Sequence, residues 1–282
     1  MHLSRNRLVV KVGTSTLTNE LGGNNLNSFD RLARALAHVH NRGYETILVT
    51  SGAIAVGGNM LGLEEKPSDL RLKQAAAAVG QCGIMKLYAK FFADYDKRIA
   101  QILLTAEDME NERKKENLVN TFEELLRLGV IPVVNENDSV SHAEIESEEK
   151  LFGDNDMLSA VVAILCRAHK LVIFSDIDGL FDGDPRINPR ARLLERVSLV
   201  DDSVISMAGG AGSRRGTGGM KTKLCAARLA ALQGIDTVIT NGRNPESLSD
   251  IMDGAPVGTL IMGGVHVQAR YTSIPEEDKR PA

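Results

Sequence analysis

The chain has 282 residues, of which 43% are hydrophobic and only 4% aromatic, and it contains no Trp. A core built from Val, Ile, Leu and Ala suits a parallel sheet covered by helices, and open α/β sheets of this length often fold as one domain. The formal net charge of −4 argues against a nucleic-acid partner, which would require a basic surface.

Short β-branched runs alternate with helical segments along the chain. We expect buried strands at residues 8–12, 46–50, 99–105, 130–134, 171–175 and 237–240. We expect helices at 28–42, with Ser28 as the cap, at 120–128 before Gly129, and at 156–168 behind a cluster of capping residues. This alternation predicts an α/β fold: right-handed βαβ crossovers and a mainly parallel central sheet with helices on both faces.

The cysteines and the chain ends suggest a cytoplasmic protein. Cys82, Cys166 and Cys225 are far apart and form no C-x-x-C pattern, as expected for reduced thiols rather than disulfides or a zinc site. No apolar run approaches the roughly 18 residues of a membrane helix, and no signal peptide precedes the first strand. We expect one domain over 1–268, a flexible tail at 269–282 and no membrane partner.

Two strand-to-helix turns near the N-terminus are candidates for anion binding, because ligands of open α/β sheets bind at the carboxyl ends of strands. In the first turn, which contains Gly13, backbone N–H groups can donate to an anion, and Lys11 supplies a positive charge beside them. The alternative is an edge-strand lysine that extends to solvent. In the second turn, Ser51 and Gly52 resemble an anion-binding helix start, although a simple serine cap explains them equally well.

Two further polar clusters follow the strand at 130–134. Residues 135–138 read Asn-Glu-Asn-Asp, and two adjacent acids at a strand end repel each other unless a cation, such as a ligand ammonium or a lysine, lies nearby. The alternative is a solvated turn. Residues 154–156 read Asp-Asn-Asp before an apolar helix; one of them is needed as a cap, which leaves two unexplained. The acidic stretch between them predicts a loop or hairpin that covers substrate.

Two glycine-containing segments lie later in the chain. The Asp-rich segment 176–184 lacks the spacing of an EF-hand, so we reject a calcium site there. Segment 209–223 holds six glycines, two Arg and two Lys, which suits a loop that folds over a polyphosphate; the alternative is a solvated loop. The Walker, G-x-G-x-x-G and G-x-S-x-G patterns are all absent. Together these features indicate an α/β phosphate-binding enzyme without a P-loop.

Eight segments resemble the amino-acid kinase family, and within it the glutamate 5-kinases. They are VVKVGTSTLT, LVTSGAIAVG, KQAAAAVGQ, QILLTAEDM, VIPVVNENDSV, FGDNDMLSA, DGLFDGDPR and GTGGMKTK. They occur in the family's order over about residues 7 to 260. The resemblance implies the fold of that family, a three-layer αβα sandwich. The chain departs from many such enzymes by ending without a PUA domain, and its acidic loop at 139–152 is longer than usual.

The resemblance also implies site residues. It assigns ATP to Lys11, Gly13, Ser175, Asp176, Thr217, Gly218, Gly219, Met220, Lys221, Thr222 and Lys223. It assigns glutamate to Ser51, Gly52, Ala53, Asp138 and Asn155. It makes Lys11, Lys223 and Asp156 the catalytic group, in which the carboxylate orients the two lysines. Ser175 stands where Thr is frequent in the family and keeps the hydroxyl. No side chain is assigned to a metal.

The implied activity is ATP- and Mg²⁺-dependent phosphorylation of the side-chain carboxylate of L-glutamate, the first step of proline biosynthesis. A homo-oligomer, coupling to glutamyl-phosphate reductase and inhibition by proline are implied as well. One alternative is a kinase of the same family that acts on N-acetylglutamate, aspartate, carbamate or a phosphorylated substrate. Another is a sensor that binds nucleotide or amino acid without catalysis. The acidic residues 135–138 favour a free ammonium over a substrate phosphate, and the two lysines with Asp156 favour catalysis.

Overall fold

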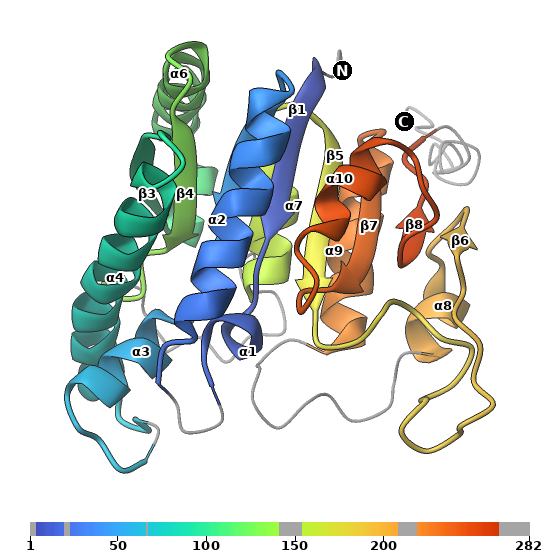
Figure 1. The fold of residues 1–282 in the computed structure, drawn as a ribbon, viewed down its shortest axis with the longest axis horizontal. Coiled ribbons are helices and arrows are strands. Elements are labelled where there is room, and N and C mark those ends of the chain that lie inside the picture. The colour runs from blue at the N-terminus through green and yellow to red at the C-terminus, as the bar shows by residue number, and fades with distance from the viewer. Residues whose placement is uncertain (1–3, 20–22, 66, 141–153, 208–218, 265–282) are drawn as a thin grey trace, which may run out of the picture.

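An eight-stranded sheet with helices on both faces organises the chain (Figure 1). The computed structural model describes residues 4–19, 23–65, 67–140, 154–207 and 219–264. The strands are β1 (Ser4–Lys11), β2 (Glu45–Val49), β3 (Ile99–Leu104), β4 (Ile131–Glu136), β5 (Ala168–Ser175), β6 (Arg196–Val197), β7 (Asp236–Asn241) and β8 (Thr259–Ile261). The helices are α1 (Thr14–Leu17), α2 (Leu26–Asn41), α3 (Ala53–Met60), α4 (Leu70–Ala93), α5 (Ala106–Glu110), α6 (Glu112–Arg127), α7 (Asn155–Leu165), α8 (Asp202–Met207), α9 (Met220–Leu232) and α10 (Ser247–Met252).

The strand order places β1 at the point where the chain changes direction across the sheet. The order is β3-β4-β2-β1-β5-β7-β8-β6, and every neighbouring pair is parallel except β7 with β8. The chain builds outward on one side of β1 through β2 and returns on the other side through β5. Ligands of such sheets bind in the crevice beyond the carboxyl ends of the strands at this reversal. The fold therefore predicts a ligand site at the carboxyl end of β1.

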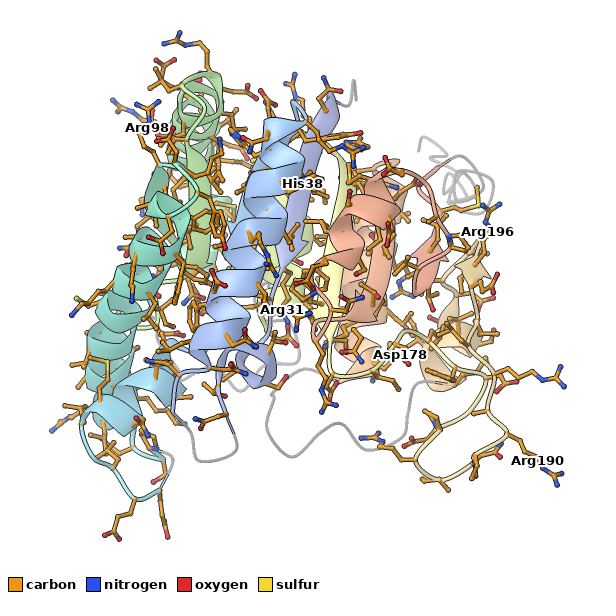
Figure 2. The ribbon with its side chains drawn as sticks, viewed as in Figure 1. Arg31, His38, Arg98, Asp178, Arg190 and Arg196 are labelled. Carbon is orange, nitrogen blue, oxygen red and sulfur yellow. The ribbon has the colours of Figure 1, made fainter. Side chains whose placement is uncertain are left out.

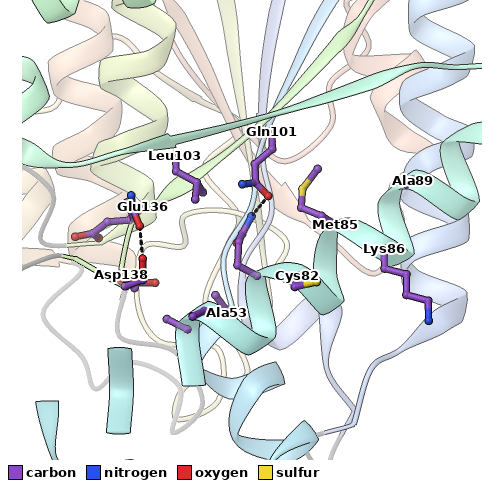
Figure 3. Close-up of a pocket in the computed structure, with 14 residues that line it drawn as sticks. Ala53, Cys82, Met85, Lys86, Ala89, Gln101, Leu103, Glu136 and Asp138 are labelled. Atoms are coloured by element: carbon purple, nitrogen blue, oxygen red, sulfur yellow. Dashed lines mark hydrogen bonds between the residues drawn. The ribbon is translucent and has the colours of Figure 1, made fainter. Parts of the chain in front are cut away.

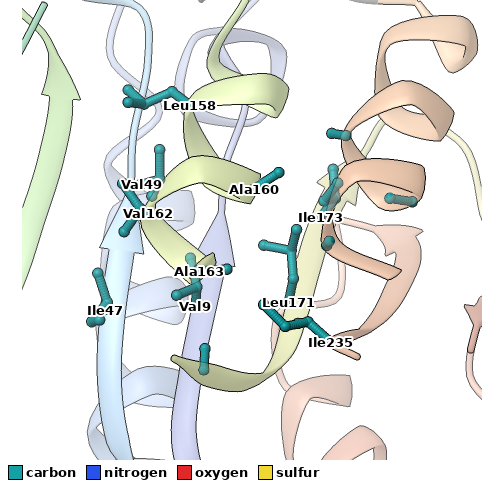
Figure 4. Packing of buried hydrophobic residues seen from close by; sticks show 14 of the residues in the cluster. Val9, Ile47, Val49, Leu158, Ala160, Val162, Ala163, Leu171, Ile173 and Ile235 are labelled. Atoms are coloured by element: carbon teal, nitrogen blue, oxygen red, sulfur yellow. The ribbon is translucent and has the colours of Figure 1, made fainter. Parts of the chain in front are cut away.

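Two apolar cores, one on each face of the sheet, join the sheet to the two layers of helices. Side chains alternate along β1, so Leu8 and Val10 belong to one core and Val9 to the other. The first core contains buried residues of α2, α3, α4 and α10, and the second those of α6, α7 and α9. Figure 4 shows α7 packed over the sheet through Leu158 and Val162, near Val49 of β2. The predicted sandwich with a mainly parallel sheet is confirmed.

The predicted elements match the structure with a few corrections. All six expected strands are present, whereas the two- and three-residue strands β6 and β8 were not expected. Ser28 is not the cap of α2: Asn25 is, and its side chain accepts from the Ser28 amide. Helix α6 begins at Glu112, eight residues before the expected start, and ends before Gly129, which has a φ of +67°. Helix α7 covers Asn155–Leu165 and stops before residue 168, where β5 begins. The expected tail at 269–282 and most of the acidic loop lie outside the described residues.

Helices α3 and α4 pack with their backbones in contact. A Cβ atom on Gly57 would lie 1.7 Å from the carbonyl oxygen of Ala76, and one on Gly80 would lie 1.9 Å from that of Ala53. Only glycine fits at such distances, so the two helices cross at a fixed point. Helix α4 is also tied to the end of β2, because the Tyr88 and Thr50 hydroxyls are 2.9 Å apart. These contacts fix α4 against the carboxyl end of the sheet.

A buried arginine joins several elements toward the other end of β1. Arg7 makes a 2.8 Å bond to Glu45 of β2, a two-pronged contact with Glu123 of α6, and a bond to the carbonyl of Cys166 after α7. Burial opposes the charge, but the hydrogen bonds that Arg7 donates to the two glutamates outweigh it and raise the pKa of Arg7. The guanidinium thus ties two strands and two helices together away from the carboxyl ends of the strands.

Candidate functional site

One buried carboxylate holds two lysines at the carboxyl end of β1. Asp156, in the first turn of α7, is fully buried. Its Oδ1 lies 2.5 Å from the Nζ of Lys11, the last residue of β1, and its Oδ2 lies 3.0 Å from the Nζ of Lys223 in the first turn of α9. The Thr222 hydroxyl donates to the same Oδ2 at 3.0 Å. Lys11 is therefore not an edge-strand lysine that extends to solvent.

The two lysines keep Asp156 ionised despite its burial. Burial alone would raise the pKa of Asp156, but Lys11 and Lys223 lower it overall. The preceding Asp154 caps α7 by accepting from the Asp156 amide. Burial and the neighbouring Asp156 charge raise the pKa of Asp154. Of the three polar residues at 154–156, one is thus the cap, one pairs with the lysines, and Asn155 bonds elsewhere.

The turns after β1 and β2 touch each other beside this group. The Thr14 and Ser51 hydroxyls are 3.1 Å apart, and Ser51 also donates to the carbonyl of Val12 at 3.3 Å. Gly52 has a φ of +93°, a left-handed conformation that favours glycine, and it directs the chain into α3. Gly13 precedes α1 close to the lysine, since a Cβ there would lie 3.6 Å from the Lys11 Nζ. The two turns together form a small-residue surface.

The residues assigned to nucleotide lie on α9 and at the end of β5. Gly219 caps α9, Met220 and Thr222 are half-buried, and Lys221 is exposed. Ser175 ends β5, the neighbour of β1, and its hydroxyl donates to the exposed Asp176 at 3.3 Å. Thr217 and Gly218 lie outside the described residues.

Hydrogen bonds join the end of β7 to the end of β5 and to the segment that follows β5. The Asn241 side chain donates to Asp178 at 2.7 Å, and Asp178 is labelled below these strands in Figure 2. The backbone of the two strands is joined there as well, because the Gly242 amide donates to the Ser175 carbonyl at 2.8 Å.

A pocket of about 660 Å³ opens between α4 and the ends of β3 and β4 (Figure 3). Of the residues assigned to glutamate, Ala53 and Asp138 line it; Cys82, Met85 and Lys86 of α4 contribute another wall. Asp138 is half-buried, and burial raises its pKa to about 6. A nearby cationic ligand would stabilise the ionised form of such a partly buried carboxylate.

A chain of side-chain amides runs from this pocket to α7, and the sequence did not predict it. Asn155 donates to Asn135 at 3.2 Å, Asn135 donates to Gln81 at 2.9 Å, and Gln81 donates to Gln101 at 3.4 Å (the dashed line at Gln101 in Figure 3). Asn135 and Glu136 belong to β4 rather than to a turn. A polar Gln81 among the alanines and glycines of a helix is the signal in the sequence that could have indicated a buried partner.

Metal binding by side chains alone has no support in the described part of the chain, where no three His, Cys, Asp or Glu side chains gather to hold an ion. Mg²⁺ in phosphoryl-transfer sites is usually held by one or two carboxylates together with substrate phosphates. Asp154 fits that requirement, because its Oδ2 is buried and has no hydrogen-bond partner among the described residues.

The described part of the chain contains no helix with the length and apolar character needed to cross a membrane.

Known proteins resemble this chain in sequence and in fold. It is 52% identical over 256 residues to a glutamate 5-kinase of Clostridium perfringens, which covers 91% of this chain and 95% of that protein. It is 44% identical to a glutamate 5-kinase of Lactococcus lactis, over 92% and 96% of the two chains. Among solved structures, UMP kinase from Bacillus anthracis superposes with a TM-score of 0.62 at 16% identity, over 92% of this chain and 97% of that one.

A second solved structure, the isopentenyl phosphate kinase of T. acidophilum, superposes with a TM-score of 0.61 at 16% identity, over 90% and 99% of the two chains. At such low identity these two structures bear on the fold alone. The sequence pattern of the amino acid kinase family matches residues 6–241, which include the whole Lys11, Asp156 and Lys223 group. The chain belongs to the amino acid kinase family.

Proposed function

We propose that this chain transfers the γ-phosphoryl group of ATP to the side-chain carboxylate of L-glutamate, giving ADP and L-glutamyl 5-phosphate. The observation that carries this proposal is the buried group of Lys11, Asp156 and Lys223 at the crevice of the sheet. The 52% identity to a glutamate 5-kinase supports the choice of acceptor.

The chemistry requires charge cancellation rather than proton transfer. The glutamate carboxylate is ionised near neutral pH and attacks the γ-phosphorus in line, so no general base is needed. Two anions must approach, and negative charge spreads over the transferring group and the leaving oxygen. Lys11 and Lys223 supply two fixed positive charges, and backbone N–H groups of the Gly13 and Gly52 turns supply further donors. Asp156 holds the lysines in place and takes no proton.

The acceptor lies between Asn155 and the pocket beside α4. Asp138 pairs with the α-ammonium of glutamate, a cation that would offset the cost of burying this acid. Ser51, Gly52 and Ala53 contact the acceptor from the end of β2. An acidic wall of this kind penalises an acceptor that carries a phosphate.

The nucleotide lies on the side of α9 and β5. Gly219, Met220, Lys221, Thr222 and Lys223, together with the preceding Thr217 and Gly218, contact its phosphates, and Ser175 and Asp176 lie toward its nucleoside. Mg²⁺ would neutralise phosphate charge, and the buried Asp154 is the carboxylate of this chain that would hold it.

The cellular setting follows from the same proposal. The protein is cytoplasmic and a homo-oligomer, and proline is its feedback inhibitor. Its acyl phosphate product is labile, so glutamyl-phosphate reductase consumes it directly.

The test is coupled ADP release with MgATP and a panel of glutamate, N-acetylglutamate, aspartate and carbamate. Hydroxylamine is included to trap an acyl phosphate as a hydroxamate. Turnover and hydroxamate with glutamate alone are expected. Turnover with another acceptor would keep the mechanism and contradict the role of Asp138. A folded protein that binds ATP but is silent with all four acceptors would indicate a sensor.

A further inference from the structure

Helix α4 carries the polar side chain of Gln81 into the interior beside its crossing with α3. Gly80 packs against the backbone of α3, and Gln81 follows it, 8% exposed. One helical turn beyond Gly80, Ile84 is fully buried, and Tyr88 bonds to the end of β2. Gln81 therefore has little freedom to move with respect to the sheet.

The amide of Gln81 sets the direction of the hydrogen bonds that follow it. Its Oε1 accepts from the Asn135 Nδ2 at 2.9 Å, so the Asn135 Oδ1 is the atom that faces α7. That oxygen accepts from the Asn155 Nδ2 at 3.2 Å. Asn135 is 1% exposed, and a buried amide with both ends bonded does not turn over freely.

The consequence falls on Asn155. Because its Nδ2 is committed to Asn135, its Oδ1 is the end left for a ligand, and a carbonyl oxygen accepts hydrogen bonds from an ammonium. We infer that Gln81 is a positioning residue for the acceptor, which acts through Asn135 to present the carbonyl end of Asn155 to the substrate ammonium. This inference rests on the proposed function and adds a residue that helps the site to recognise the acceptor.

The test compares three changes at Gln81 and on α4. Gln81→Met keeps the volume and removes the oxygen that accepts from the Asn135 Nδ2, so one end of that amide loses its bond and the amide can turn; the KM for glutamate should rise about tenfold, with kcat and the KM for ATP within about threefold. Gln81→Glu keeps an acceptor for Asn135 and should restore the KM to within about threefold of the wild type. Lys90→Met, an exposed position nine residues later on the same helix, is the control and should change neither KM.

A double variant separates positioning from a general loss of structure. If Gln81 acts through Asn155, Gln81→Met should add no further rise in glutamate KM to an Asn155→Ala protein. Additive effects, an unchanged KM in Gln81→Met, or equal losses in every kinetic constant would each overturn the inference.

Calorimetric titration of glutamate, without turnover, distinguishes this inference from the proposed function. Binding without phosphorylation by the wild type would contradict the function alone, and the same variants would then be compared by their dissociation constants for glutamate. A wild-type protein that binds no glutamate would overturn both.

Discussion

At the scale of single residues, the arrangement around Asp156 shows why one carboxylate serves two lysines. An unpaired buried carboxylate is costly, and here each oxygen faces its own ammonium group. Two lysines with one aspartate leave an excess of one positive charge. In the proposed reaction an incoming phosphoryl group would neutralise that excess, and the lysines would interact most strongly with the charge that develops during transfer.

Replacing Lys223 by Ala should lower kcat by about 10²–10³ while the KM for glutamate changes far less, because the lysine stabilises charge in the transition state. Steady-state kinetics with both substrates measures this. Lys90→Ala, an exposed lysine of α4, is the control and should behave like the wild type. A normal kcat in Lys223→Ala would remove this lysine from the mechanism.

The KM for glutamate should rise as the pH falls through about 6. Burial raises the pKa of Asp138 to about 6, so the carboxylate that we propose as the partner of the ammonium becomes neutral below that pH. The pH profile of kcat/KM for glutamate from pH 5 to 8 measures the effect. Asp138→Asn should show a high KM whose rise near pH 6 has disappeared; a variant with the wild-type profile would assign the titration to another group.

At the scale of elements, the crossing of α3 and α4 joins packing to the site. The same helices contribute Ala53 and most of one pocket wall. Their separation is set by Gly57 and Gly80, whose missing side chains allow carbonyl groups to approach. A change at this crossing should therefore reach the acceptor pocket without touching it.

Gly57→Ala should destabilise the protein by about 2–4 kcal/mol, since a Cβ would lie 1.7 Å from the Ala76 carbonyl oxygen and the helices would have to separate. Gly58→Ala is a close control: its Cβ would meet nothing nearer than 3.8 Å, and it should be neutral or slightly stabilising. Urea unfolding of both variants checks this. Equal stability of the two would mean that the crossing tolerates separation.

The elements that could be predicted from the sequence are those with a clear local signal. Buried β-branched runs between turn residues located six strands, and Gly129 marked the end of α6. Strands β6 and β8 are too short to show alternation, and the Ala- and Gly-rich α4 lacks a clean polar face. Lysines and acids of the site were predictable by type and turn. Their contacts, such as Asp156 with a lysine 67 residues away, depend on tertiary packing that sequence spacing does not contain.

At the scale of the whole molecule, the lysine–aspartate group and the buried Arg7 with its ion pairs lie toward opposite ends of β1. Arg7 joins β1, β2 and α6 at one end, and Lys11 faces Asp156 at the other. The alternating apolar residues between them connect both cores. Stability and catalysis should therefore be separable by mutation.

Arg7→Met should lower the free energy of unfolding by on the order of 2–3 kcal/mol, because the Cys166 carbonyl and two partly exposed glutamates lose their partner. The kcat of the folded protein should stay within twofold of the wild type. Chemical unfolding and kinetics at a permissive temperature measure the two effects. Arg98→Met is the control: among the described residues this exposed arginine donates one side-chain bond, at 3.2 Å to the Leu128 carbonyl, and its loss should cost little. A large loss of kcat in Arg7→Met would show that the two ends are coupled.

The three charged residues of the site come from the beginning, the middle and the last third of the chain. During synthesis on the ribosome, Lys11 and Asp156 emerge well before Lys223, and α9 cannot complete the group until its own residues are released. A nascent chain that stops short of α9 carries Lys11 and Asp156 but not Lys223. Fragments from premature termination before α9 therefore lack the second lysine of the proposed reaction, and the complete group arises only late in translation.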